Sequence, residues 1–405
     1  MKKTSILLLT LCLLSIACQP RRTKLFDPQQ VAFSAEYNPL FDGQIYPSFI
    51  LGLNNSTLND QFSIFDISLI SPADNAVLRI VIDSSSLNYV TIFQEIMPKR
   101  GEKYTYHPNI KWKYDVLRRL RGPGNIDLTF TCYINDEEVD IKNMRLAYRT
   151  VNECPLSLQY NGQTEDFRWL FAAYVNEDHP QIEHILTDIL DQGIINRFNG
   201  YQGNAKAVSD QVFAIWYYAL SRGITYSSIS CTSNPSSRAN VQHIRFFDEV
   251  WGTRQANCVD ACVFFASILR KIGLRPIIFV EPCHAYLGYY TDKNKNNIAL
   301  LETTITAWVN FPELERSLDA DGRLPQDKFN KIRRYLSDAD AERYQRGELS
   351  FDQLKLAVAR TLFNKAGEYD LETYNDNKKH FADPSSITFQ QLDIEQLRKN
   401  VQPIN

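Results

Sequence analysis

The hydrophobic pattern of the chain changes at residues 152–155 (NECP), and this change limits the folds that its 405 residues can adopt. Over 31–152, short alternating or apolar runs are separated by turn sequences such as SPADN, PKRGE and RGPGN. Further on, apolar residues recur at helical spacing over 164–175, 180–192 and 205–222. Period-two alternation favours strands, and recurrence every three to four residues favours helices. The sequence therefore predicts an α+β fold in which a β-rich part comes first.

The β-rich segment 31–152 is expected to form an antiparallel β-sandwich of immunoglobulin-like size. Its candidate strands are VAFSAEY, QFSIFDISLI, AVLRIVID, NYVTIFQEI, IDLTFTCYI and MRLAYRTV. No cluster of acid, base and nucleophile stands out in this segment. A structural or positioning role is therefore expected for it.

The N-terminus resembles the export signal of a bacterial lipoprotein. MKK supplies positive charge, and ILLLTLCLL supplies an apolar core too short to span a bilayer as a mature helix. Ala17 precedes Cys18 as in a lipidation signal, although Ser15 stands where leucine is usual. We expect a signal peptide over 1–17, lipidation of Cys18 and a polar tether over 18–30. Ordinary secretion, with Cys18 incidental, is the alternative.

The expected location is outside the cytoplasm, with a lipid anchor in the membrane. Gln19 follows the cysteine where an aspartate would favour retention in the inner membrane, so the outer membrane or cell surface is expected. Disulfides would be permitted there, and pairing of Cys132 with Cys154 is one hypothesis. The net charge of −3 gives no electrostatic reason to expect a nucleic-acid partner. The sequence leaves the oligomeric state open.

Cys258 is the candidate nucleophile. It begins the apolar stretch VDACVFFASILRKIG, for which Asn257 is a suitable N-cap, Asp260 lies in the first turn and Gly273 marks the end. The first turn of a helix favours a thiolate, because unpaired N–H groups and the helix dipole point at it. Cys262 lies one turn further and is expected to pack in the core. A buried, unreactive thiol is the alternative for Cys258.

His284 and Glu302 are the candidate partners of this thiol. Three strands are expected after the helix, LRPIIFVE, HAYLGYY and IALLETT, with the turn-rich TDKNKNN joining the last two. His284 would act as general base, and Glu302 would accept a hydrogen bond that orients the imidazole. For the two to face each other directly, the hairpin must be centred on Lys293. A core histidine and a strand-edge salt bridge are the alternatives.

The segments ANCVDACVFFASILRKIGLRPIIFV, CHAYLGYY and LLETT resemble, in order and spacing, the bacterial transglutaminase-like domain. The resemblance covers about residues 153–310, so we assign this domain to 153–315 and a mainly helical extension to 316–405. It implies a papain-like α+β fold and a triad that acts on amides without a cofactor or metal. Carried over, the roles are nucleophile for Cys258, base for His284, orienting acid for Glu302 and oxyanion helper for Gln242. For Gln242 the alternative is a polar residue where a helix begins.

The sequence departs from the family pattern near the nucleophile and the base. Ala256 and Ala261 stand where many relatives have glycine, Cys283 stands where glycine is common, and Glu302 replaces the usual aspartate. A zinc site made by Cys258, Cys262, Cys283 and His284 is a further alternative. Adjacent strand residues point to opposite faces, which disfavours joint ligation by Cys283 and His284.

These residues predict an exported cysteine enzyme that attacks amide or peptide bonds through a thioester. Its expected partners are peptide or protein substrates, with hydrolysis favoured over crosslinking. The competing prediction is an inactive transglutaminase-like scaffold that binds proteins or peptides at the cell surface.

Overall fold

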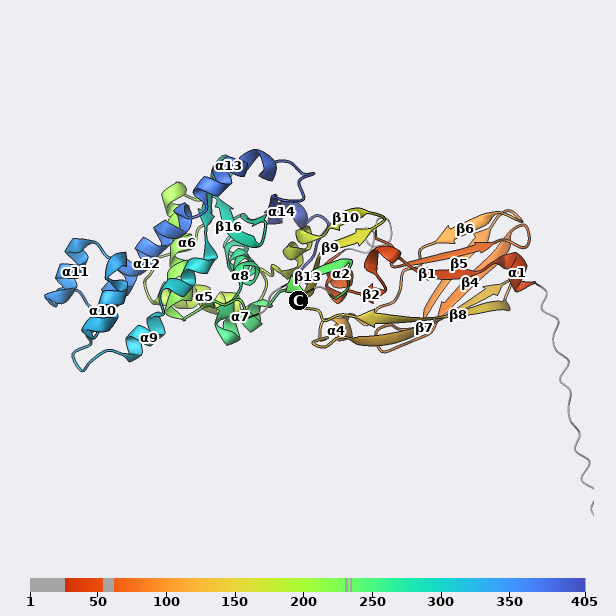
Figure 1. The fold of residues 1–405 in the computed structure, drawn as a ribbon, viewed down its shortest axis with the longest axis horizontal. Coiled ribbons are helices and arrows are strands. Elements are labelled where there is room, and N and C mark those ends of the chain that lie inside the picture. The colour runs from red at the N-terminus through yellow and green to blue at the C-terminus, as the bar shows by residue number, and fades with distance from the viewer. Residues whose placement is uncertain (1–25, 54–61, 230–231, 234, 405) are drawn as a thin grey trace, which may run out of the picture.

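The computed structural model describes residues 26–53, 62–229, 232–233 and 235–404 (Figure 1). The expected signal peptide, Cys18 and most of the expected tether lie outside these ranges. The fold is mixed α+β, with 37% helix, 27% strand and several sheets. Within the described ranges, no helix is both long enough and apolar enough to cross a bilayer.

Two sheets make up the β-rich part at one end of the molecule (Figure 1). One has the strand order β2-β8-β7-β4-β5 and the other the order β1-β3-β6. Along β4, Leu78, Ile80 and Ile82 are buried in alternation, which is the period expected of a strand with one covered face. The rings of Phe65 in β3 and Phe130 in β7 lie 5.3 Å apart, so the two sheets pack face to face. The strands are β1 (Ser34–Tyr37), β2 (Gln44–Ile45), β3 (Phe65–Ile70), β4 (Ala76–Ile82), β5 (Thr91–Met97), β6 (Lys103–Tyr106), β7 (Gly124–Ile134) and β8 (Glu137–Tyr148).

Each of the six predicted runs contains a strand, and three features of this part were not predicted. Val31 ends the short helix α1 (Pro28–Val31) and is not part of a strand. Strands β2 and β6 were missed, and β2 pairs in parallel with β8. Helices α2 (Pro47–Gly52) and α4 (Tyr114–Leu117) and the 3-10 turn η1 (Pro39–Phe41) lie between strands.

A four-stranded sheet, of order β10-β9-β13-β12, follows residue 152. The helix predicted over 164–175 is wrong, because Gln163–Asp166 forms β10 and Arg168–Tyr174 forms the 3-10 helix η2. Asn161 and Gly162 have φ angles of 51° and 76°, and this pair turns the chain back from β9 into β10. An Asn-Gly pair is a strong hairpin signal and could have been read in the sequence. The other strands are β9 (Glu153–Tyr160), β12 (Thr232–Ser233) and β13 (Ala239–His243).

Another four-stranded sheet has the order β17-β16-β15-β18 and carries the candidate base. Helix α8 (Cys258–Lys271) packs against β15 and β16, so the predicted helix and the three strands after it are confirmed. The fourth strand, β18, comes from the C-terminal region and pairs with β15. The strands are β15 (Pro276–Glu281), β16 (His284–Tyr290), β17 (Ile298–Leu301) and β18 (Gln390–Asp393).

Helices cover this sheet and form the end of the molecule opposite the β-rich part (Figure 1). The helices predicted over 180–192 and 205–222 are present as α5 (Pro180–Asp191) and α6 (Ala205–Ser221). Residues 316–405 are mainly helical as expected, with β18 as an addition. The longest helix of this region, α12, contacts both α6 and β17. The remaining helices are α7 (Phe247–Thr253), α9 (Phe311–Arg316), α10 (Gln326–Ile332), α11 (Asp338–Gln345), α12 (Phe351–Glu368), α13 (Leu371–Phe381) and α14 (Ile394–Leu397), with 3-10 turns η3 (Thr303–Trp308) and η4 (Arg333–Tyr335).

The last residues of the chain form hydrogen bonds with α2 in the β-rich part and with η2. The N–H of Gln402 donates to the carbonyl of Gly52 at the end of α2, over 2.8 Å. The N–H of Ile404 donates to the carbonyl of Ala173 in η2, over 2.9 Å. The C-terminal segment therefore connects the two halves of the molecule.

The hypothesis that Cys132 pairs with Cys154 is not supported, because both are free thiols in different sheets. Each is fully buried in its strand. Burial raises the pKa of the Cys132 thiol to about 12 and holds that of Cys154 well above its usual value. Both side chains therefore serve as small core residues.

Candidate active site

A reciprocal cap fixes the start of α8 and with it the position of Cys258. The side chain of Asn257 accepts a hydrogen bond from the N–H of Asp260 over 2.8 Å, and Asp260 accepts one from the N–H of Asn257 over 3.0 Å. This capping box confirms both sequence predictions for the helix start. Cys258 is the first helical residue and is partly exposed.

A buried ion pair ties the start of α8 to the strand beside it. Asp260 is fully buried, and its carboxylate lies 2.8 Å from the guanidinium of Arg245, just after β13. The N–H of Arg245 donates to the same carboxylate over 2.8 Å. Cys262 is buried as expected, and burial holds the pKa of its thiol well above the usual value. The helix therefore presents one accessible thiol, Cys258, and one inert thiol.

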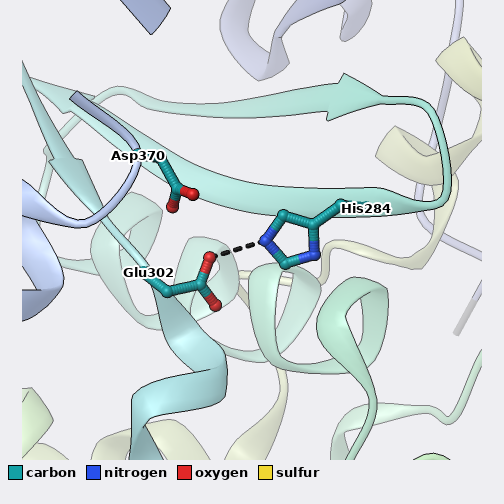
Figure 2. A group of neighbouring side chains, drawn as sticks. All are labelled: His284, Glu302 and Asp370. Atoms are coloured by element: carbon teal, nitrogen blue, oxygen red, sulfur yellow. Dashed lines mark hydrogen bonds and ion pairs between the residues drawn. The ribbon is translucent and has the colours of Figure 1, made fainter. Parts of the chain in front are cut away.

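The hydrogen bond expected between His284 and Glu302 is present, with 2.6 Å between Nε2 and Oε2 (Figure 2). The expected register is wrong, because β16 and β17 pair around Asn294 rather than Lys293. The ladder ends at Leu301, and Glu302 begins the turn η3. The two side chains therefore meet diagonally across the strands, a separation that long side chains can bridge.

The charges in this group set the protonation of the imidazole. Burial alone would lower the pKa of His284, but hydrogen bonds with Cys258 and Glu302 and the charge of Glu302 raise it from 6.5 to about 10. Burial alone would raise the pKa of Glu302. Its hydrogen bonds and the charge of His284 outweigh burial and lower this pKa below the usual value, and the hydrogen bond with His284 has the largest lowering effect. His284 is therefore protonated at neutral pH, opposite an ionised Glu302.

Backbone contacts hold Glu302 in place. The side-chain Oε1 accepts a hydrogen bond from the N–H of Thr304 over 2.6 Å. The N–H of Glu302 donates to the carbonyl of Ala366 in α12 over 2.8 Å. Because Oε1 and the peptide N–H are both occupied, Oε2 is left to orient His284.

Cys258 and His284 open onto a cleft of about 490 Å³. Gln242 lies on β13 and lines the same cleft, so the alternative that placed it where a helix begins is wrong. Its side-chain amide donates to the carbonyl of His243 over 3.0 Å. The structure thus brings together all four predicted residues of the site, with Glu302 behind His284. The cleft is also lined by Leu156, Ser157, Thr164, Asp166, Arg168, Phe171, Tyr226, Ser228, Asn240, Asn257, Val259, Val280, Glu281, Pro282, Cys283, Ala285 and Ile387.

The turn before His284 holds Cys283 in a backbone conformation that favours glycine. Cys283 has a φ of 62°, the left-handed region that glycine adopts without steric cost. The two-residue turn Pro282–Cys283 places Glu281 directly opposite His284. Cross-strand partners project from the same face of a sheet, so the carboxylate of Glu281 lies beside the imidazole. Sequence reasoning missed Glu281, although a carboxylate ending an apolar strand was a signal.

One further acidic residue reaches the site, and sequence reasoning missed it as well. Asp370, just before α13, has a carboxylate oxygen within 4.8 Å of ligating atoms of both His284 and Glu302. Figure 2 shows the three side chains pointing toward one another from three separate segments. Among the described residues, this trio is the group that could hold a metal ion, rather than the cysteine set considered above. No local pattern in the sequence marks Asp370.

Comparison with known protein families finds no match for the chain, and comparison with curated proteins finds no significant relative.

Proposed function

We propose that the protein is a cysteine enzyme that acts on amide or peptide bonds, with Cys258, His284 and Glu302 as its triad. The observation that carries this proposal is the position of His284 (Figure 2). Its imidazole is hydrogen-bonded to the buried Glu302 and lines the same open cleft as Cys258, whose thiol is among the groups that raise the imidazole pKa. An acid, an imidazole and a nucleophile in this order are the parts that covalent acyl transfer requires.

The reaction begins from a Cys258 thiolate beside a protonated His284. The sulfur attacks the carbonyl carbon and forms a C–S bond, while the N–H of Cys258 is placed to stabilise the oxyanion. The C–N bond then breaks, and His284 gives its proton to the departing amine. Water next loses a proton to His284 and attacks the thioester, which breaks the C–S bond, releases the acid and restores the Cys258 thiolate beside a protonated His284.

Water is the favoured second nucleophile because its concentration far exceeds that of any amine. Transfer to an amine would proceed through the same thioester and is the alternative reaction. The lining of the cleft includes apolar side chains such as Leu156 and Phe171 beside the ion pair of Arg168 with Asp166. This mixture suits a peptide segment better than a small apolar molecule.

The chain segments outside the site fit an auxiliary role in this proposal. Residues 153–315 would form the transglutaminase-like domain, and the two sheets of residues 31–152 would form an immunoglobulin-like module that positions it.

Export and lipidation of Cys18 at the outer membrane or cell surface complete the proposal. Incorporation of labelled palmitate by the natural chain, and its loss in Cys18→Ala, would test the anchor.

The test of the reaction is labelling by a peptide vinyl sulfone, followed by mapping of the modified peptide. We expect one adduct at Cys258, none in Cys258→Ala and strongly slowed labelling in His284→Ala. The inactive scaffold would be supported by two results together. Neither substitution would change the labelling, and the natural chain and Cys258→Ala would bind peptide equally tightly.

A further inference from the structure

Asp370 connects the C-terminal helices to the candidate triad. Helix α12 accepts the backbone hydrogen bond of Glu302 at the carbonyl of Ala366. Asp370 lies four residues further, about one helical turn, and only 5% of its surface is exposed. The same segment therefore contacts Glu302 through its backbone and brings a second carboxyl group to its side chain (Figure 2).

Two carboxyl groups this close cannot both carry a charge without a large cost, so one of them holds a proton. Within the described part of the chain, no group donates a hydrogen bond to Asp370 Oδ2, although this atom is fully buried. Glu302 accepts hydrogen bonds from Thr304 and His284, which stabilise its ionised form. The proton therefore belongs to Asp370, and Glu302 is its acceptor.

We propose that Asp370, as a neutral carboxylic acid, donates a hydrogen bond to Glu302 and positions that carboxylate for His284. Asp370 is a positioning residue, because it lies behind Glu302 and contacts neither the nucleophile nor the cleft. The inference deepens the proposed function and rests on it.

The surroundings of Asp370 agree with this protonation state. Burial is the largest of the influences that raise its pKa to about 8, followed by its contact with Glu302. Glu281 on β15 adds a raising effect, and His284 on β16 a lowering one. Tyr286 on β16 and Cys262 on α8 also interact with it. Asp370 is accordingly neutral below about pH 8 and ionises above it.

A metal ion bridging the same three side chains fits the geometry less well. A tetrahedral zinc ion with ligands at about 2.0–2.1 Å holds them more than about 3 Å apart. Nε2 of His284 and Oε2 of Glu302 are separated by 2.6 Å, which is a charge-assisted hydrogen bond.

The experiment compares Asp370→Asn, Asp370→Ala and the natural chain, with Glu372→Gln as control. Asparagine keeps an N–H donor toward Glu302 but cannot ionise, whereas alanine removes the donor. Glu372 is an exposed carboxylate in the first turn of α13 and lies outside the trio. One readout is the site-mapped rate of Cys258 alkylation by iodoacetamide between pH 6 and pH 10. The other is the NMR titration of His284, assigned with His284→Ala.

We expect Asp370→Ala to slow alkylation of Cys258 about tenfold at pH 7, the effect of one lost buried hydrogen bond. Asp370→Asn should stay close to the natural rate. The His284 signal should show an inflection near pH 8 in the natural chain and in Glu372→Gln, and none in Asp370→Asn.

The proposal would be overturned if Cys258 were alkylated in both Asp370 variants at the rate of the natural chain and both variants showed the same His284 titration as the natural chain. Stoichiometric zinc that survives dialysis and is lost in Asp370→Asn would overturn it in favour of a metal site. If Cys258 is unreactive in the natural chain while the inflection near pH 8 still depends on Asp370, the positioning role stands and the proposed function fails.

Discussion

At the scale of single residues, the charge on Glu302 controls the proton on His284. Burial lowers the pKa of the imidazole, and the hydrogen-bond partners and the Glu302 charge raise it from 6.5 to about 10. A raised histidine pKa stabilises the fold below the ordinary value and loses this effect as pH rises through the folded value. The contribution of His284 to stability is therefore fully present below pH 6.5 and is lost as pH rises through about 10.

Replacing Glu302 with glutamine should move the pKa of His284 from about 10 back toward 6.5. Glutamine keeps the size and a hydrogen-bond acceptor but removes the charge. NMR titration of His284 measures the change, and Glu313→Gln, at an exposed carboxylate outside the trio and the cleft, serves as control. A His284 titration that is the same in both variants and in the natural chain would contradict the account.

Cys283 occupies a backbone conformation that suits glycine. A left-handed φ costs a residue with a Cβ about 1–2 kcal/mol, and glycine loses about 0.5–1 kcal/mol through its greater freedom in the unfolded chain. We expect Cys283→Gly to raise the free energy of unfolding by up to about 1 kcal/mol, measured by urea denaturation. Cys283→Ala keeps the conformation and removes only the thiol, so equal stability of the two variants would show that the backbone is not strained.

At the scale of elements, the start of α8 depends on a buried charge pair. Arg245→Ala would leave the carboxylate of Asp260 buried without its cation. Breaking such a pair typically costs about 3–5 kcal/mol. We expect a loss of that size in urea denaturation and slower alkylation of Cys258, since the capping box shares the same carboxylate. Arg316→Ala, at an exposed arginine, is the matched control; a comparable loss there would mean that the pair has no special role.

Elements with strong local signals could be predicted from the sequence. The cap formed by Asn257 and Asp260 marked the start of α8, and alternating or apolar runs marked β15, β16 and β17. The hairpin register was wrong by one residue, because the polar turn offers several positions for its tip and Lys295 takes up a positive φ of 63°. The strand β18 was missed because its pairing with β15 joins residues more than one hundred positions apart.

At the scale of the whole molecule, the C-terminal region completes both the fold and the site. Its strand β18 extends the sheet that carries His284, and Asp370 reaches Glu302 from α12 and α13. Sequence reasoning assigned no chemistry to this region. A single aspartate in a charged helical segment does not belong to any recognisable sequence pattern. Asp370 comes close to Glu302, nearly seventy positions earlier, only when the chain folds.

The last residues should also stabilise the molecule as a whole. Ile404 is fully buried and its N–H bonds to Ala173, while Arg118 near α4 donates to its carbonyl over 2.9 Å. Truncating a buried isoleucine to alanine costs about 2–5 kcal/mol, so Ile404→Ala should lower the free energy of unfolding by that amount in urea denaturation. Leu356→Ala, at a side chain 42% exposed, should have little effect. An unchanged Ile404→Ala variant would mean that the tail is only loosely attached.

The central claim is that His284 and Glu302 activate Cys258, and the most direct test is competitive alkylation of the cysteines in the folded protein. Exposed Cys283 and buried Cys262 serve as internal references on the same chain. The account predicts that iodoacetamide at neutral pH modifies Cys258 about tenfold faster than Cys283, and that His284→Ala abolishes this difference. Equally slow modification of Cys258, Cys262 and Cys283, unchanged by His284→Ala, would contradict it.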